Sequence, residues 1–257
     1  MGRGRRGAWA VVTIAVCLAA GSATHGQTEG LVPSRRYADC MDEARLDPEI
    51  GHKAAQAWRA DGGGMAARHC AAVALLGLGQ YAEAAQMLRT LADGAAAKGA
   101  GFRFELLTQA ANAWLIAGKP NTAYEIQTEA LEARPHDIEL LIDRSISLAS
   151  TEKYWRALDD LNLVLDLDPM RVDALIFRAS AYRRLDELGL ARENIARALA
   201  IAPRHLEALL ERGIIRRLEG DKQGARQDWA RVVEIGSGTP EGAAARLNLE
   251  RMDAKPR

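Results

Sequence analysis

The sequence predicts an all-α protein, an α-α superhelix (solenoid) of tandem helical hairpins, and three observations lead to this prediction. Aromatic residues make up only 5% of the 257 residues, while alanine and leucine are abundant, which favours closely packed helices over a β-sheet. Pro135, Pro169 and Pro203 lie 34 residues apart. Rows of apolar and small residues recur with the same step, as is typical of repeat architectures.

The recurring rows give each repeat the same internal pattern. Small side chains let two helices approach closely, and leucines fill the space between them. Proline at the end of the second helix cannot continue it. One hairpin cannot bury its apolar face alone, so we expect the repeats to stack and to leave a concave inner surface. The rows are Ala123, Ala157, Ala191 and Ala225; Leu107, Leu141, Leu175 and Leu209; and Ala111, Ser145, Ala179 and Gly213.

This pattern resembles the tetratricopeptide-repeat family, in which a 34-residue helix–turn–helix unit is repeated. The sequence departs from the family motif at Arg68 and Arg216, near the two ends of the array. The resemblance implies about five hairpins with a helical cap at each end. The expected segments are a divergent N-terminal helical pair over 35–61, a repeat-like unit over 65–98, repeats over 104–137, 138–171, 172–205 and 206–239, and a capping helix over 241–253.

Residues 1–23 are expected to form a cleaved signal peptide. Arg3, Arg5 and Arg6 precede an apolar run over residues 8–20, and small residues follow at 21–23, which is the order of a secretory signal. The run is shorter than the about 20 residues that span a bilayer. We therefore expect a periplasmic or secreted mature chain with no membrane span. Anchoring by an uncleaved N-terminal segment is the alternative.

Charge and motifs limit the possible functions. Removal of residues 1–23 leaves 31 basic and 34 acidic side chains, and such a nearly neutral chain is not expected to bind nucleic acid. Catalytic carboxylate pairs, a nucleophile beside a base, a phosphate-binding loop and a metalloprotease motif are not recognisable in the sequence. We therefore predict no enzyme activity, no catalytic residue, no metal and no cofactor.

Cys40 and Cys70 are the two cysteines outside the predicted signal peptide. An isolated pair in an oxidising compartment is expected to form a disulfide, which would join the N-terminal helical pair to the next hairpin. Free thiols are one alternative. A metal site that also uses His69 is another, but neighbouring residues on a helix point about 100° apart, so His69 and Cys70 rarely bind one ion together.

Charged residues also follow the 34-residue period. Arg144, Arg178 and Arg212 are each followed 16 residues later by an acid or amide, at Asp160, Asn194 and Asp228. We expect these pairs to form bonds inside the hairpins. Glu105, Glu139, Asp173 and Glu207 lie near the starts of first helices, and Arg183-Arg184 and Arg216-Arg217 near the ends. These charges either complement helix dipoles or give a groove an acidic and a basic edge that orient a charged peptide.

The resemblance implies a ligand groove on the concave face, at positions 5, 9 and 12 of each first helix. The predicted groove residues are Thr108, Asn112, Ile142, Ile146, Ile176, Ser180, Arg183, Leu210, Ile214 and Arg217. Their apolar centre suggests a protein or peptide partner, unless the chain's own termini cover it. We predict a non-catalytic protein–protein interaction scaffold in the cell envelope. The alternatives are a homo-oligomeric assembly adaptor or an enzyme with no recognisable site.

Overall fold

The structure, a computed structural model, describes residues 34–95 and 100–253. The predicted signal peptide lies outside the described residues. Within those ranges the chain forms thirteen α-helices and no strand, and none of these helices is both long and apolar enough to cross a membrane. The chain divides after Pro169 into two compact units. We call their described parts the N-terminal unit (residues 34–169) and the C-terminal unit (residues 170–253).

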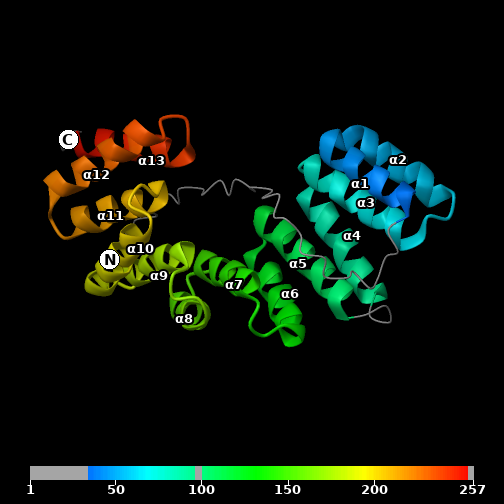
Figure 1. Cartoon of the computed structure of the whole chain (residues 1–257), viewed down its shortest axis with the longest axis horizontal. Helices are drawn as coiled ribbons and strands as arrows, with labels where there is room; N and C mark the ends of the chain where they lie inside the picture. The colour runs from blue at the N-terminus through cyan, green and yellow to red at the C-terminus, as the bar shows by residue number, and fades with distance from the viewer. Residues whose placement is uncertain (1–33, 96–99, 254–257) are drawn as a thin grey trace, which may run out of the picture. The chain divides into compact units, whose positions relative to one another are not determined.

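The N-terminal unit is a stack of helices in which each helix packs against the next one along the chain (Figure 1). Helix α1 also packs along α3, so the first two helices cover the end of the stack. The helices are α1 (Arg35–Leu46), α2 (Pro48–Ala60), α3 (Gly64–Gly77), α4 (Tyr81–Gly94), α5 (Ala100–Ile116), α6 (Pro120–Ala133), α7 (Ile138–Ser150) and α8 (Tyr154–Leu167).

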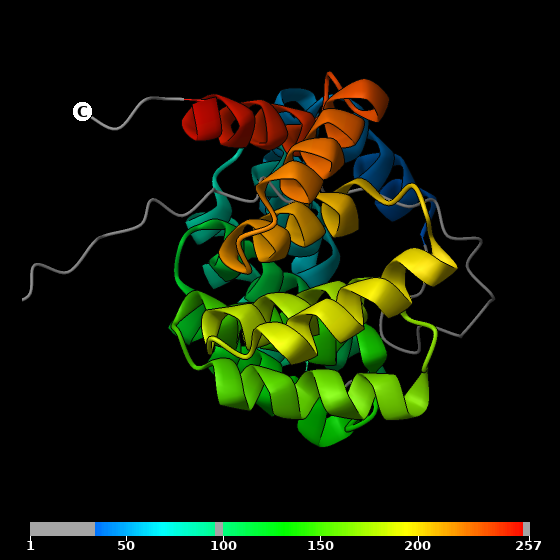
Figure 2. The ribbon, with the colours of Figure 1, turned by 90° about the vertical axis from the view of Figure 1, so that its left-hand side faces the viewer.

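The C-terminal unit consists of two hairpins and a final helix. Its helices are α9 (Val172–Arg184), α10 (Leu188–Ile201), α11 (Leu206–Leu218), α12 (Lys222–Ile235) and α13 (Pro240–Asp253). Helix α11 contacts both α9 and α13, so these three helices lie side by side. Helix α13, in red, packs against α12, in orange (Figure 2).

The recurring rows of small and apolar residues form the interior of both units. All four alanines of the first row and all four leucines of the second are buried, as is the row that runs from Ala111 to Gly213. Each hairpin thus buries the same positions, and stacking joins these interiors. The all-α solenoid class predicted from the sequence is confirmed.

The turn inside each hairpin repeats with the same 34-residue step. The residue with a left-handed backbone is Gly118 (φ 73°), Glu152 (φ 61°), Asp186 (φ 65°) and Gly220 (φ 92°) in successive hairpins. Glycine adopts this conformation without steric cost, whereas Glu152 and Asp186 do not. Helices α6, α8 and α10 each end two residues before one of the three prolines, because proline cannot continue a helix.

The predicted bonds inside the hairpins are present in both units. Each arginine lies on a first helix and reaches a buried partner on the second. Charge-assisted bonds of this kind satisfy groups that burial would otherwise leave costly. The pairs are Arg144–Asp160 (2.9 and 2.6 Å), Arg178–Asn194 (2.8 Å) and Arg212–Asp228 (3.0 and 2.6 Å).

Candidate functional site

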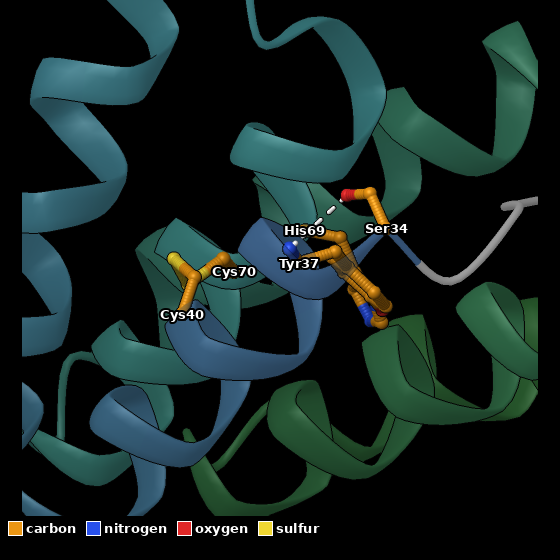
Figure 3. The surroundings of a disulfide bond; sticks show 5 residues. All are labelled: Ser34, Tyr37, Cys40, His69 and Cys70. Atoms are coloured by element: carbon orange, nitrogen blue, oxygen red, sulfur yellow. Dashed lines mark hydrogen bonds between the residues drawn. A yellow bond between two sulfur atoms is a disulfide. The ribbon is translucent and has the colours of Figure 1, made fainter.

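A disulfide joins the start of the N-terminal unit to its first repeat-like hairpin. Cys40 on α1 and Cys70 on α3 are both buried, and their sulfur atoms are bonded with the Cα atoms 6.1 Å apart (Figure 3). This is the pair that the sequence analysis expected to bridge. Because α1 and α3 are tied at this point, the helical pair α1–α2 is attached covalently to the stack.

His69 lies next to this disulfide and links three helices (Figure 3). Its Nδ1 is 2.6 Å from the hydroxyl of Tyr37 on α1, and its Nε2 is 3.1 Å from Oε1 of Gln109 on α5. An amide oxygen can only accept, so Nε2 carries the proton and Nδ1 accepts from Tyr37. Burial lowers the pKa of His69, which keeps the ring neutral. Both sulfurs are in the disulfide and both ring nitrogens are hydrogen-bonded, so Cys40, His69 and Cys70 present no free ligand atom to a metal in this structure.

We use the term first-helix face for the side of α5, α7, α9 and α11 that carries the predicted groove positions. In the N-terminal unit this face brings Asn112 of α5 near Asp143 of α7. A hydrogen bond from Asn112 lowers the pKa of Asp143, but burial and the charges of Glu139 and Asp137 raise it overall to about 6. In the described chain, the buried atoms Thr108 Oγ1 and Asn112 Oδ1 have no hydrogen-bond partner. This face therefore contains two buried polar atoms without a partner, and Ile146 on α7 is half-buried.

The predicted groove must be corrected at two residues, because their side chains are buried. Ile142 and Ile176 are 5% and 1% exposed, so they offer no surface to a partner. The physical reason is that a first helix has several neighbours. Helix α9, for example, packs against both α10 and α11, so its free stripe is narrower than the sequence pattern suggests.

In the C-terminal unit, an ion pair crosses the first-helix face from α9 to α11. Arg183 donates to Glu211 through Nε (2.5 Å) and Nη2 (3.3 Å), and Nη2 also lies 3.2 Å from Ser180 Oγ. The side chains of Arg183 and Glu211 are largely buried. The predicted groove residues Ser180 and Arg183 are thus brought together, but Arg183 is already engaged by a partner within the unit.

Glu207 lies at the start of α11, one helical turn before Glu211. Burial raises its pKa to about 7, and the charges of Glu211, Glu241 and Asp173 contribute in the same direction. Asp173 is itself bound by Arg171, at 2.7 and 2.9 Å. The first turns of α9, α11 and α13 therefore form an acidic end of this face.

The rest of the α11 face is at least partly accessible, and its side chains become more exposed toward the end of the helix. Leu210 and Ile214 are half-buried, while Arg217 and Leu218 are exposed. Elsewhere in the described ranges, no group of three or more histidine, cysteine or acidic side chains could hold a metal ion. The α11 face thus offers apolar side chains between charged ends.

Comparison with known proteins finds similar solved structures but no matching family model or curated sequence. MamA (residues 41 to the end) from Desulfovibrio magneticus RS-1 is 20% identical over 65% of this chain and 92% of its own, with a TM-score of 0.57. YrrB, described as a TPR protein with an unusual peptide-binding site, is 22% identical over 66% and 88%, with a TM-score of 0.55.

The chain has the tetratricopeptide-repeat fold. A second MamA structure supports this over a longer stretch, since it covers 87% of this chain and 98% of its own at a TM-score of 0.52 and 13% identity. At such identities the likeness concerns the fold alone.

The sequence analysis missed two carboxylates of the tetratricopeptide-repeat first helices. Asp143 and Glu211 both occupy position 6, directly after the predicted groove residues Ile142 and Leu210. The recurrence of an acidic residue at position 6 of two repeats could have been noticed in the sequence. Its meaning depends on burial and on neighbours such as Asn112 and Arg183, which only the fold supplies.

Proposed function

We propose that this protein is a non-catalytic interaction scaffold of the cell envelope that binds a segment of a partner protein on its first-helix faces. The observation that carries the proposal is that Ile146, Leu210 and Ile214 keep accessible surface at the predicted groove positions. Accessible apolar side chains that the core does not need are typical of protein interaction sites. Grooves of this kind take helices or extended peptides.

The peptide-binding site named for YrrB supports a peptide or protein partner for a chain of the same fold. Fold alone does not determine function, so the support for binding at this face comes from its side chains. Buried titratable groups such as His69 and Glu211 have partners inside the fold, which favours a structural role for them over a catalytic one.

The proposed location in the cell envelope has two supports. One is the predicted signal peptide at residues 1–23. The other is the Cys40–Cys70 disulfide, because disulfides persist in oxidising compartments and are rare in the cytosol. Cell fractionation and the mass of the mature N-terminus test both. An uncleaved chain in the cytosolic fraction would contradict the location.

The binding face can be tested with a photo-crosslinking amino acid placed at Ile146 or at Ile214 in cells. We expect a discrete adduct with one partner protein from at least one of these positions. The matched controls are Ala196 and Ala200, which are exposed on the second helix α10 and should give none. Equal adducts from all four positions would contradict a defined binding face. An adduct of twice the chain mass would identify a second copy as the partner.

Substitution gives an independent test. The double variant Ile146→Glu plus Ile214→Glu is expected to lose the partner and to keep its helical content, because both side chains are only half-buried. Ala196→Glu is the control and should retain the partner. A double variant that is folded and still binds would show that the site lies elsewhere.

A further inference from the structure

One side of α11 stays accessible while the other side packs into the C-terminal unit. Ala208, Leu209, Gly213 and Ile215 are buried. Most residues of the accessible side are spaced three, four or seven apart, which is the spacing of one helix face. We call this side the α11 stripe, and its residues are Glu207, Leu210, Ile214, Arg217 and Leu218.

Glu207, at the first end of the stripe, is a carboxyl group without a cation. The arginines that act nearby are already engaged, since Arg171 binds Asp173 and Arg183 binds Glu211. The charges acting on Glu207 come from α9, α11 and α13 and are all negative. Within the described chain Glu207 has no ion pair. Burial of a carboxylate among like charges is unfavourable, so a cation placed there from outside would be strongly attracted.

Arg217, at the other end, is exposed and has no ion pair or hydrogen bond to any part of the chain that the structure describes. Ten residues separate it from Glu207, which corresponds to about 15 Å along the helix axis. Leu210 and Ile214 lie between them. Along the α11 stripe, from Glu207 to Arg217, the side chains are therefore first acidic, then apolar and finally basic.

We propose that the α11 stripe binds a peptide segment of the partner protein that places a basic side chain on Glu207, apolar side chains on Leu210 and Ile214, and an acidic group on Arg217. This inference rests on the proposed scaffold function. The two charged ends fix the direction in which the segment lies, because the opposite direction would bring like charges together.

The helix dipole also favours acids in a first turn and cations in a last turn. That effect is sufficient for a solvated glutamate, but it does not account for a half-buried Glu207 near three other carboxylates. The corresponding face of α7 provides a contrast within the molecule. It also begins with an acid, Glu139, but ends in Ala149 and Ser150, so it lacks the cationic end.

Binding of such a segment is coupled to protons. Glu207 is partly protonated near neutral pH, since burial and the charges of Glu211, Glu241 and Asp173 raise its pKa to about 7. A cation placed beside it favours the ionised form. Binding at pH 7 should therefore release a fraction of a proton, and acidification below pH 6 should weaken it.

The experiment selects peptides from a random twelve-residue displayed library on the immobilised mature chain, residues 24–257. The selected peptides are then measured by titration calorimetry against wild type, Glu207→Gln and Arg217→Gln. Each variant should weaken binding about tenfold, as expected for a charge-assisted contact. Glu193→Gln and Arg251→Gln, which change exposed residues outside the stripe, should change binding less than about twofold.

Two further readouts separate recognition from a merely structural role. Heats measured in buffers of different ionisation enthalpy should show proton release for wild type and none for Glu207→Gln. Glu207→Lys should prefer peptides in which an acid replaces the base. Peptides that bind both neutral variants as well as wild type would overturn the inference. If those peptides are lost on Ile146→Glu, the scaffold function still stands. If no peptide binds wild type, both the function and the inference fail.

Discussion

The two units share one hairpin design but stabilise their interiors differently. In the N-terminal unit, the Cys40–Cys70 disulfide and the His69 contacts join α1, α3 and α5. That unit also buries Gln127 completely, and its amide atoms have no partner in the described chain.

In the last hairpin of the C-terminal unit, the position that corresponds to Gln127 is occupied by Trp229. Its indole packs against Gly213 and donates to the carbonyl of Leu210 at 3.2 Å. The large side chain of Trp229 on α12 thus fits because Gly213, on the facing helix α11, has no side chain. The 34-residue repeat thus determines which positions pack against each other in both units. Residues that depart from the repeat pattern, such as Gln127 and Trp229, are accommodated differently in each unit.

The largest expected effect is the loss of the disulfide. The double variant Cys40→Ala plus Cys70→Ala should lower the unfolding free energy of the N-terminal unit by about 3–4 kcal/mol, because the bond closes a loop of roughly 30 residues in the unfolded chain. Hydrogen exchange should show reduced protection in α1–α4 and unchanged protection in α11–α12. Wild type under reducing conditions is the control and should match the variant. Unaltered exchange in α1 and α3 would disprove the assigned role.

Gly213→Ala tests the packing that distinguishes the C-terminal unit. An added Cβ would lie 2.3 Å from Trp229 Nε1, and overpacking of this kind costs about 2 kcal/mol. Gly189→Ala is the matched control, because its Cβ would meet no atom within 4 Å. It should instead stabilise the fold by about 0.5 kcal/mol through helix propensity. Urea unfolding measures both, and equal effects of the two variants would refute the packing argument.

Gln127→Leu addresses the corresponding position of the N-terminal unit. Leucine restores the apolar residue that Leu161 and Ile195 supply in later repeats and removes a buried amide without partners. We expect a gain of about 1–2 kcal/mol in unfolding free energy. Gln109→Leu should have the opposite sign, since Gln109 accepts from His69. A loss of stability in Gln127→Leu would show that the amide is satisfied in solution.

The last expected effect is a pH dependence in the C-terminal unit. The folded pKa of Glu207, about 7, lies above its ordinary value of 4.5, so its contribution to stability is full below pH 4.5 and is lost as the pH rises through 7. Glu207→Gln does not titrate. It should match wild type near pH 4.5 and exceed its unfolding free energy by an amount that grows as the pH rises through 7 to 8. A constant difference across the range would contradict the burial argument.

Three groove positions could be predicted from the sequence because they depend only on the spacing of residues along a helix. Ile146, Leu210 and Ile214 lie at the repeat positions that face away from the packed interior, and they are partly accessible in the structure. Ile176 has the same spacing and yet is buried. Sequence position gave the direction of its side chain, but the helices that cover it come from the fold.

The hairpin period and the identity of the buried rows could be read from the sequence, because helix periodicity and turn chemistry act between near neighbours in the chain. The cysteine pair could be predicted because Cys40 and Cys70 are the two cysteines outside the predicted signal peptide. Two other matters came only from the tertiary structure: the engagement of Arg183 by Glu211 and the desolvation of Glu207. Each of these depends on which distant groups stacking brings within a few ångströms, and electrostatic and steric energies change steeply over that range.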